Sequence, residues 1–281
     1  MPLSKKKRIA ISIAGGCGSA IILAMLYLFL WGPLSPFSPC LPGFHCKDTN
    51  KARIYYHDGA DISALNGIDA IVTAVEEAHG LKFPGKAQFI VCASDAEYRR
   101  RASTGSRFCV FPGYGRLLIS RRGLDDGVNH TIHLDVYLAH EVSHSLLYST
   151  TGLWSSLRFP DWALEGVAVY TSNQRGVDGY LTKDEVRDKI QQGYFLSPSD
   201  FWTKPWKSTK ALKEFPLENK YWFVYSELAC FVEYLIETGG RDKFWTYLDG
   251  LRKGKDAEES FMALYGKPFD VVVKAFRDAM K

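Results

Sequence analysis

Apolar and polar residues alternate along this chain with two different periods, and these periods divide it into two parts. Between residues 53 and 120 the apolar runs are short and bounded by turn residues. In order, they predict a strand at 53–57, a helix at 61–79, a strand at 87–93, a short helix near Glu97 and paired strands around 107–110 and 116–120. After Gly166 the pattern is mostly helical. We therefore predict an α+β fold, with an N-terminal mixed α/β lobe around a small sheet and a C-terminal, mainly helical lobe.

One further helix joins the two parts. Its apolar positions recur every four residues, at Leu134, Leu138, Val142 and Leu146. This spacing gives the helix a continuous apolar face that can be buried. A ligand face lies beside that stripe, because His140 and His144 are also four residues apart and project from one side of the helix.

The run from His140 to His144 reads His-Glu-Val-Ser-His, which is the spacing of a hydrolytic zinc site. Two imidazoles on one helix face can bind one metal ion, and Glu141 lies beside them as a candidate general base. A catalytic zinc usually has three protein ligands and one open position for water. The sequence must therefore provide a third ligand elsewhere.

Glu165 is our candidate for the third zinc ligand. Pro160 and Asp161 predict a helix start, with Asp161 able to cap free amides, and Glu165 then lies one turn into that helix. Gly166 is small enough to let this helix approach the first one closely. His133 lies seven residues before His140 and is a competing third ligand, unless Asp135 caps the helix and leaves His133 in the approach to it.

The combination of His140-Glu-Val-Ser-His144 with Trp162-Ala-Leu-Glu-Gly-Val-Ala168 resembles the gluzincin metallopeptidases, the group of thermolysin and aminopeptidase N. More narrowly, it is similar to bacterial peptidase MA-like domains, and the resemblance covers residues 53–281. It implies a zincin-like fold, one Zn²⁺ per chain and a peptide or protein substrate. Two features depart from parts of the group. Val169 occupies the place of a histidine-orienting Asp, and no Gly-rich exopeptidase segment precedes the zinc helix.

The expected chemistry follows from these residue types. Zinc held by His140, His144 and Glu165 would make a water molecule acidic, and Glu141 would move its proton. The resemblance implies an oxyanion donor on a later helix, for which Tyr225 is our choice and Tyr221 the competitor. Mn or Co could occupy the same donors. The alternative function is a non-catalytic envelope protein that keeps the zincin fold for binding or scaffolding.

The N-terminal sequence predicts a membrane anchor. Four basic residues at 5–8 precede residues 9–31, which carry no charge and are long enough to cross a hydrocarbon core of about 30 Å. We expect residues 1–8 to form a cytoplasmic tail, 9–31 a retained transmembrane signal anchor, 32–52 a Pro-rich stem and 53–281 the metallopeptidase domain. The catalytic domain would then be extracytoplasmic, on a bacterial inner membrane and facing the periplasm or the cell exterior.

Charge gives no reason to expect nucleic acid as a partner. The chain has 35 basic and 31 acidic residues, and the four basic residues at 5–8 account for its whole net charge of +4. Residues 9–281 therefore balance at 31 against 31. The oligomeric state leaves no signal in the sequence.

The cysteines predict two disulfides if the domain is exported. The simplest pairing joins Cys40 to Cys46 and Cys92 to Cys109, and reduced, buried thiols are the alternative. Cys17 and Cys230 are expected to stay unpaired. A separate segment, residues 196–217, contains Trp202 and Trp206 and predicts either a lid over the substrate groove or a loop whose tryptophans fill the core.

Overall fold

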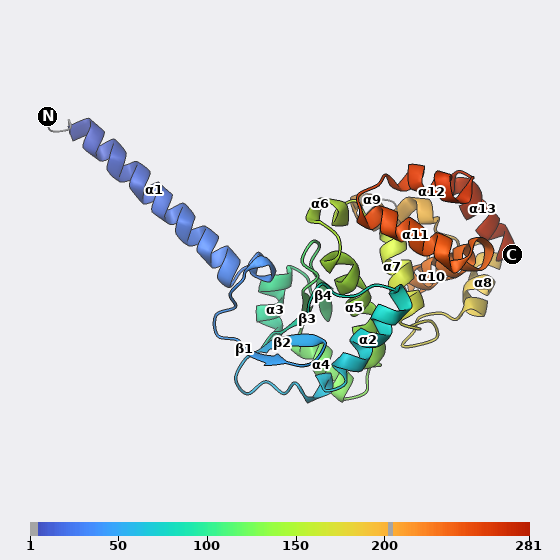
Figure 1. Ribbon diagram of the computed structural model, residues 1–281, viewed down its shortest axis with the longest axis horizontal. Coiled ribbons are helices and arrows are strands. Elements are labelled where there is room, and N and C mark those ends of the chain that lie inside the picture. The colour runs from blue at the N-terminus through green and yellow to red at the C-terminus, as the bar shows by residue number, and fades with distance from the viewer. Residues whose placement is uncertain (1–4, 202–204) are drawn as a thin grey trace.

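A small twisted sheet holds the N-terminal half of the body together, in the computed structural model shown in Figure 1. The structure describes residues 5–201 and 205–281, with side chains from residue 17 to 201 and from 210 to 281. The strand order is β1 (His45–Asp48), β2 (Ala52–Tyr56), β3 (Ala87–Val91), β5 (Leu117–Ile119) and β4 (Phe108–Val110). β2, β3 and β5 run parallel, while β1 and β4 are antiparallel strands at the two edges. The four predicted strands are confirmed, with β2 shifted by one residue and β3, β4 and β5 shorter than predicted, and β1 is an addition.

Helices cover both faces of this sheet because its central strands are apolar on both sides. Phe89 and Leu117 point to the face covered by α2 (Ile68–His79), α4 (Arg121–Val128) and α5 (Leu134–Ser149). Ile90 and Leu118 point to the other face, where Tyr98 of α3 (Asp95–Ala102) packs on them. This alternation has the period of two that a strand imposes. One face of the sheet thereby supports α5, which carries both candidate histidine ligands.

The second half of the chain is helical, as predicted, and encloses its own core. Its elements are α6 (Leu153–Ser156), α7 (Asp161–Thr171), α8 (Lys183–Gln191), η3 (Pro198–Phe201), α9 (Pro205–Glu214), α10 (Lys220–Gly239), α11 (Arg241–Arg252), α12 (Ala257–Tyr265) and α13 (Phe269–Ala279). Trp162 of α7 is fully buried at the centre of this core and contacts Phe231, Tyr247 and Phe269. The mixed α/β architecture with a small sheet and a mostly helical C-terminal part is confirmed.

The segment 196–217 contains two of these elements, η3 and α9, rather than irregular chain alone. The side chains of Trp202 and Trp206 lie outside the described residues. Both the lid and the core-filling loop therefore stay predictions.

Gly166 lets α7 approach α10 closely. A Cβ atom at this position would lie 2.7 Å from the Leu228 carbonyl oxygen and 2.9 Å from a Val232 methyl group. The close approach is therefore to α10, and not to the histidine helix α5 as the sequence suggested. It matters because α7 packs between α5 and α10 and carries Glu165.

Part of the 32–52 segment packs on the sheet. η1 (Ser35–Phe37) follows α1 (Lys5–Leu30), and the buried Arg116 side chain donates from Nη1 to the carbonyl oxygens of Pro36 at 3.0 Å and Ser38 at 2.5 Å. β1, later in the same segment, pairs with β2. α1 itself extends away from the body (Figure 1).

The prediction of a retained membrane anchor over residues 9–31, on which the extracytoplasmic placement of the catalytic domain rested, is wrong. Among the residues that the structure describes, no helix is both long enough and apolar enough to span a bilayer.

The predicted disulfides are also wrong, because all six cysteines are free thiols. Cys109 on β4 pairs in register with Leu118 on β5, which in turn pairs with Ile90 on β3, two residues before Cys92. β5 therefore lies between the two cysteine-bearing strands and separates them by two strand spacings, about 9–10 Å. A disulfide requires Cα atoms within about 7 Å. Cys40 and Cys46 are exposed, and the Cys46 thiol faces Asp48.

We expect Gly166→Ala to destabilise the protein by about 1–3 kcal/mol, because the added methyl group overlaps the backbone of α10. Gly152→Ala is the matched control, since its Cβ would meet no atom within 4 Å, and we expect a change within about 0.5 kcal/mol. Urea denaturation measures both free energies of unfolding. A gain of about 1 kcal/mol for Gly166→Ala, which helix propensity alone would give, contradicts the close approach.

Candidate metal centre

α5 is fixed at its start and along its buried face. His133 occupies the N-cap position, and its backbone N–H donates to Asp178 Oδ2 at 2.7 Å. On the buried side, Val142 lies in the core above the sheet. Ser143 Oγ lies 2.9 Å from Nε2 of His79, a buried residue at the end of α2. These contacts fix α5 at its start and on its buried side. His140 and His144 project from the adjacent face of the same helix.

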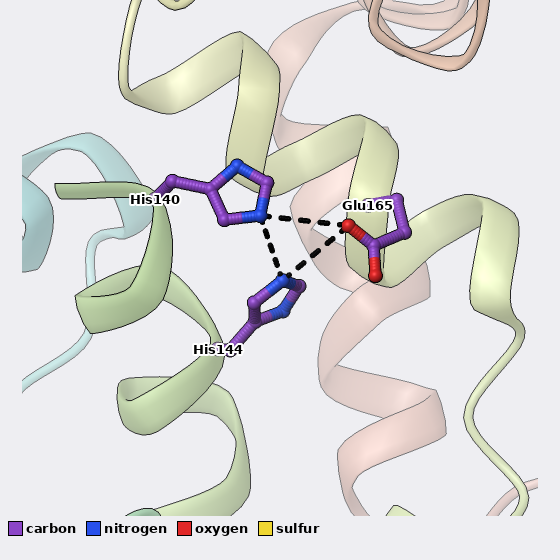
Figure 2. A group of neighbouring side chains, drawn as sticks. All are labelled: His140, His144 and Glu165. Atoms are coloured by element: carbon purple, nitrogen blue, oxygen red, sulfur yellow. Dashed lines mark hydrogen bonds and ion pairs between the residues drawn. The ribbon is translucent and has the colours of Figure 1, made fainter. Parts of the chain in front are cut away.

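α7 brings the carboxylate. Pro160 takes the N-cap position, which places Asp161 as the first helical residue instead of the cap. Glu165 lies one turn further along, next to Gly166 at the contact with α10. Its side chain is 25 % exposed and points toward the two histidines (Figure 2).

The three predicted ligands meet at one point (Figure 2). Nε2 of His140 and Nε2 of His144 are 3.1 Å apart. Glu165 Oε2 lies 3.5 Å from each of these nitrogens. Both imidazoles are buried, with His140 6 % and His144 8 % exposed. The donor atoms therefore form a small triangle at the junction of α5 and α7.

This triangle fits a tetrahedral zinc ion. Zinc bonds of about 2.0–2.1 Å at tetrahedral angles place neighbouring donors about 3.3 Å apart. The three separations here are 3.1, 3.5 and 3.5 Å. Without a cation or a shared proton, two imidazole lone pairs and a carboxylate at these distances would repel each other. The spacing and the donor types thus suit a divalent metal that accepts nitrogen and oxygen ligands.

The carboxyl groups of the site have opposite pKa shifts. Burial acts to raise the pKa of Glu165, but the adjacent imidazoles of His144 and His140 outweigh burial and lower the pKa. Burial raises the pKa of Glu141 to about 7, an effect that His140 opposes and Glu165 reinforces. Glu165 is thus held ionised, as a metal ligand would be, while the pKa of Glu141 lies close to neutral pH.

A cavity of about 330 Å³ opens onto these residues. It is lined by Ser106, Val110, Tyr137, His140, Glu141, His144, Tyr148, Glu165, Gln174, Tyr180 and Tyr225. None of the described residues in its lining is Lys or Arg. Val110 belongs to β4, so the edge of the sheet forms one wall. The cavity is large enough for a few atoms of substrate around the metal position.

The structure separates the two tyrosine candidates. Tyr225 lines the cavity, and Glu165 and then burial raise the pKa of its phenol well above the ordinary range. Tyr221 is 52 % exposed and lies outside the cavity lining. His133, the competing third ligand, pairs through Nδ1 with Asp178 Oδ1 at 2.8 Å and lies outside the ligand group.

Several lining residues were not found by the sequence analysis. Tyr137 and Tyr148 lie on the histidine helix one turn before His140 and one turn after His144, so the helical period alone could have identified them. Gln174 and Tyr180 come from the loop after α7 and carry no such signal. Gln174 is fully buried, and its Oε1 lies 2.8 Å from His140 Nδ1.

Comparisons with known proteins give only distant structural likenesses. No family model matches the chain, and no curated protein matches it. Among solved structures, a two-domain M1 zinc metallopeptidase variant bound to L-arginine superposes with 12 % identity and a TM-score of 0.45, over 84 % of this chain and 51 % of that one. An M1 zinc metallopeptidase variant from Deinococcus radiodurans gives 13 % and 0.45, over 85 % and 52 %. The chain thus spans about half the length of these proteins.

We expect the purified chain to bind one zinc ion, and His144→Ala to weaken binding more than about 100-fold, because losing even an outer partner costs about 10–100-fold. His133→Ala is the matched control, since His133 is exposed and outside the ligand group. Competition against a chromophoric chelator measures both affinities. Equal zinc affinity in all three proteins contradicts the ligand assignment.

Proposed function

We propose that this chain is a zinc-dependent hydrolase of peptide bonds, with a zincin-like fold and the ligand pattern of the gluzincins. The observation that carries the proposal is the donor triangle of His140, His144 and Glu165, whose sides of 3.1, 3.5 and 3.5 Å suit tetrahedral zinc. Three protein ligands leave a fourth position toward the cavity, as catalytic sites require and closed structural sites do not. When bound, zinc supplies a Lewis acid that polarises a carbonyl group and makes water more acidic.

Glu141 is suited to move protons in this reaction. Its carboxylate lines the same cavity as the ligands, and burial raises its pKa to about 7, close to the value that best serves a general base near neutral pH. Glu141 accepts a proton from the attacking water as the water oxygen bonds to the carbonyl carbon. The carbon–nitrogen bond then breaks, and the same proton passes from Glu141 to the leaving amine nitrogen. The carboxylate is regenerated for the next cycle.

Tyr225 is suited to stabilise the negative oxygen that forms during this attack. Because Glu165 and burial raise its pKa, the phenol keeps its proton near neutral pH and can donate a hydrogen bond. Tyr225 belongs to α10 and lines the same cavity as His140, His144 and Glu165. A substrate carbonyl bound in this cavity could then accept a hydrogen bond from the phenol.

We expect Glu141→Gln to lower kcat on a mixed peptide library by about 10²–10⁴-fold while leaving zinc stoichiometry unchanged. The amide keeps the size of the side chain but cannot accept the proton. Peptide cleavage with and without a chelator, measured by mass spectrometry, reads the effect beside metal analysis. Cleavage that persists in the Gln variant removes the role of Glu141. One zinc per chain with no cleavage by wild type favours the alternative, a non-catalytic zincin-fold binding or scaffold protein.

Tyr225→Phe should lower kcat by about 10²–10³-fold with little change in KM, because the lost hydrogen bond forms mainly in the transition state. Tyr221→Phe is the matched control on the same helix, since that side chain is exposed and outside the cavity. Steady-state kinetics on one cleaved peptide compare the two. A larger loss for Tyr221→Phe would reverse the assignment.

A further inference from the structure

We propose that Gln174 is a positioning residue for the metal site, and that its side-chain amide fixes the ring of His140 and so sets the metal affinity. This inference rests on the function proposed above. It concerns the partner of a ligand and not a ligand itself, because Gln174 points its amide oxygen at the ring nitrogen that faces away from Glu165. The residue lies 34 positions after His140 in the sequence.

A chain reversal at the end of α7 delivers this side chain. α7 ends at Thr171, and Asn173 adopts a left-handed conformation with φ of 53°. The Gln174 N–H then donates to the Val169 carbonyl at 3.2 Å, and the Asn173 N–H donates to the Tyr170 carbonyl at 3.4 Å. This is the Schellman arrangement, with Asn at the position that favours Gly or Asn. The reversal turns the chain back along the helix that carries Glu165, and Gln174 becomes fully buried beside His140.

The contact determines which nitrogen of His140 carries the hydrogen. An amide oxygen only accepts hydrogen bonds, so at 2.8 Å from Gln174 Oε1 the Nδ1 atom must be the donor. The lone pair of His140 is then on Nε2, which faces His144 and Glu165. The opposite orientation of the amide would place a hydrogen on Nε2, in the middle of the donor triangle. Only the orientation observed is compatible with a metal ion there.

The turn that holds Gln174 is itself anchored to α10. The Arg175 guanidinium makes two hydrogen bonds to the Glu233 carboxylate, at 2.8 and 3.2 Å, and Lys183 adds a third contact at 3.0 Å. Both amino groups of the guanidinium engage one carboxylate, a geometry with high directional specificity. Gln174 is therefore fixed between the helix of the third ligand and the helix of Tyr225.

An amide gives this site orientation without charge. Outer partners of zinc-bound histidines are commonly carboxylates, which also raise the basicity of the ligand. Here a carboxylate would be a third acid in a cavity that already holds Glu141 and Glu165. The second histidine has no equivalent support, since His144 Nδ1 is buried without a hydrogen-bond partner in the described part of the chain. The hydrogen bond to Gln174 is thus made by His140 and not by His144, and its loss should change the zinc affinity measurably.

The test is the zinc affinity of the full chain, measured on metal-free protein by competition against a chromophoric chelator at fixed pH. Gln174→Met keeps the shape and removes the acceptor, and we expect zinc binding to weaken about 10–100-fold. Gln174→Glu restores an acceptor and should bind zinc at least as tightly as wild type. Gln88→Met is the matched control, because Gln88 also accepts from a buried group, Arg116 Nε at 2.7 Å, outside the cavity lining. We expect that control to bind zinc within about twofold of wild type.

Thermal unfolding of the metal-free proteins separates folding from metal binding. If Gln174→Met does not fold, the Glu variant still decides, because weaker zinc binding by Gln174→Glu overturns the inference. An unchanged zinc affinity in a folded Met variant also overturns it and leaves the proposed function standing. Failure of the wild-type chain to bind zinc overturns the proposed function instead. Weakening in the Met variant, with recovery in the Glu variant, supports the positioning role.

Discussion

The packing of α7 between α5 and α10 is the contact on which the candidate site depends. Glu165 reaches the two histidines only because α7 lies against α5, and α7 holds that position through its contact with α10 at Gly166. Side chains can adjust by a rotamer, but a helix displaced by the width of a methyl group moves every donor that it carries. A triangle with sides of 3.1 to 3.5 Å tolerates little displacement. The helical core around Trp162 is therefore as important to the site as the ligands.

Residues that share one helix could be placed from the sequence, because the helical period fixes their geometry. His140, Glu141 and His144 are of this kind, and the structure brings both imidazoles together with Glu165 as expected. Gln174 could not be found in this way. Its position depends on a left-handed Asn173 and on the ion pair between the next residue, Arg175, and Glu233, 58 positions further along, and neither has a periodic signature.

The cysteines show the same limit in the sheet. In the sequence, Cys92 and Cys109 lie in two predicted strands that are separated only by a short helix. This closeness along the chain made a disulfide plausible. The spatial order of the strands differs from their order along the chain, and β5 inserts between the two. Periodicity identifies strands and their buried faces, but long-range pairing decides which strands are neighbours. The charge-free run at residues 9–31 is a similar case. Its composition alone predicted a membrane-spanning helix, and none of the described helices is long and apolar enough to be one.

The core around α7 draws on residues from Leu147 to Met280, so the carboxylate ligand is held by helices that lie more than a hundred residues beyond the second histidine. If the site binds metal as proposed, metal uptake reports whether this C-terminal core has assembled. A substitution in α13, which carries none of the donor atoms, would then weaken metal retention by loosening the core around α7. Measuring the metal content of many single variants would therefore identify the residues of this core as well as the metal ligands.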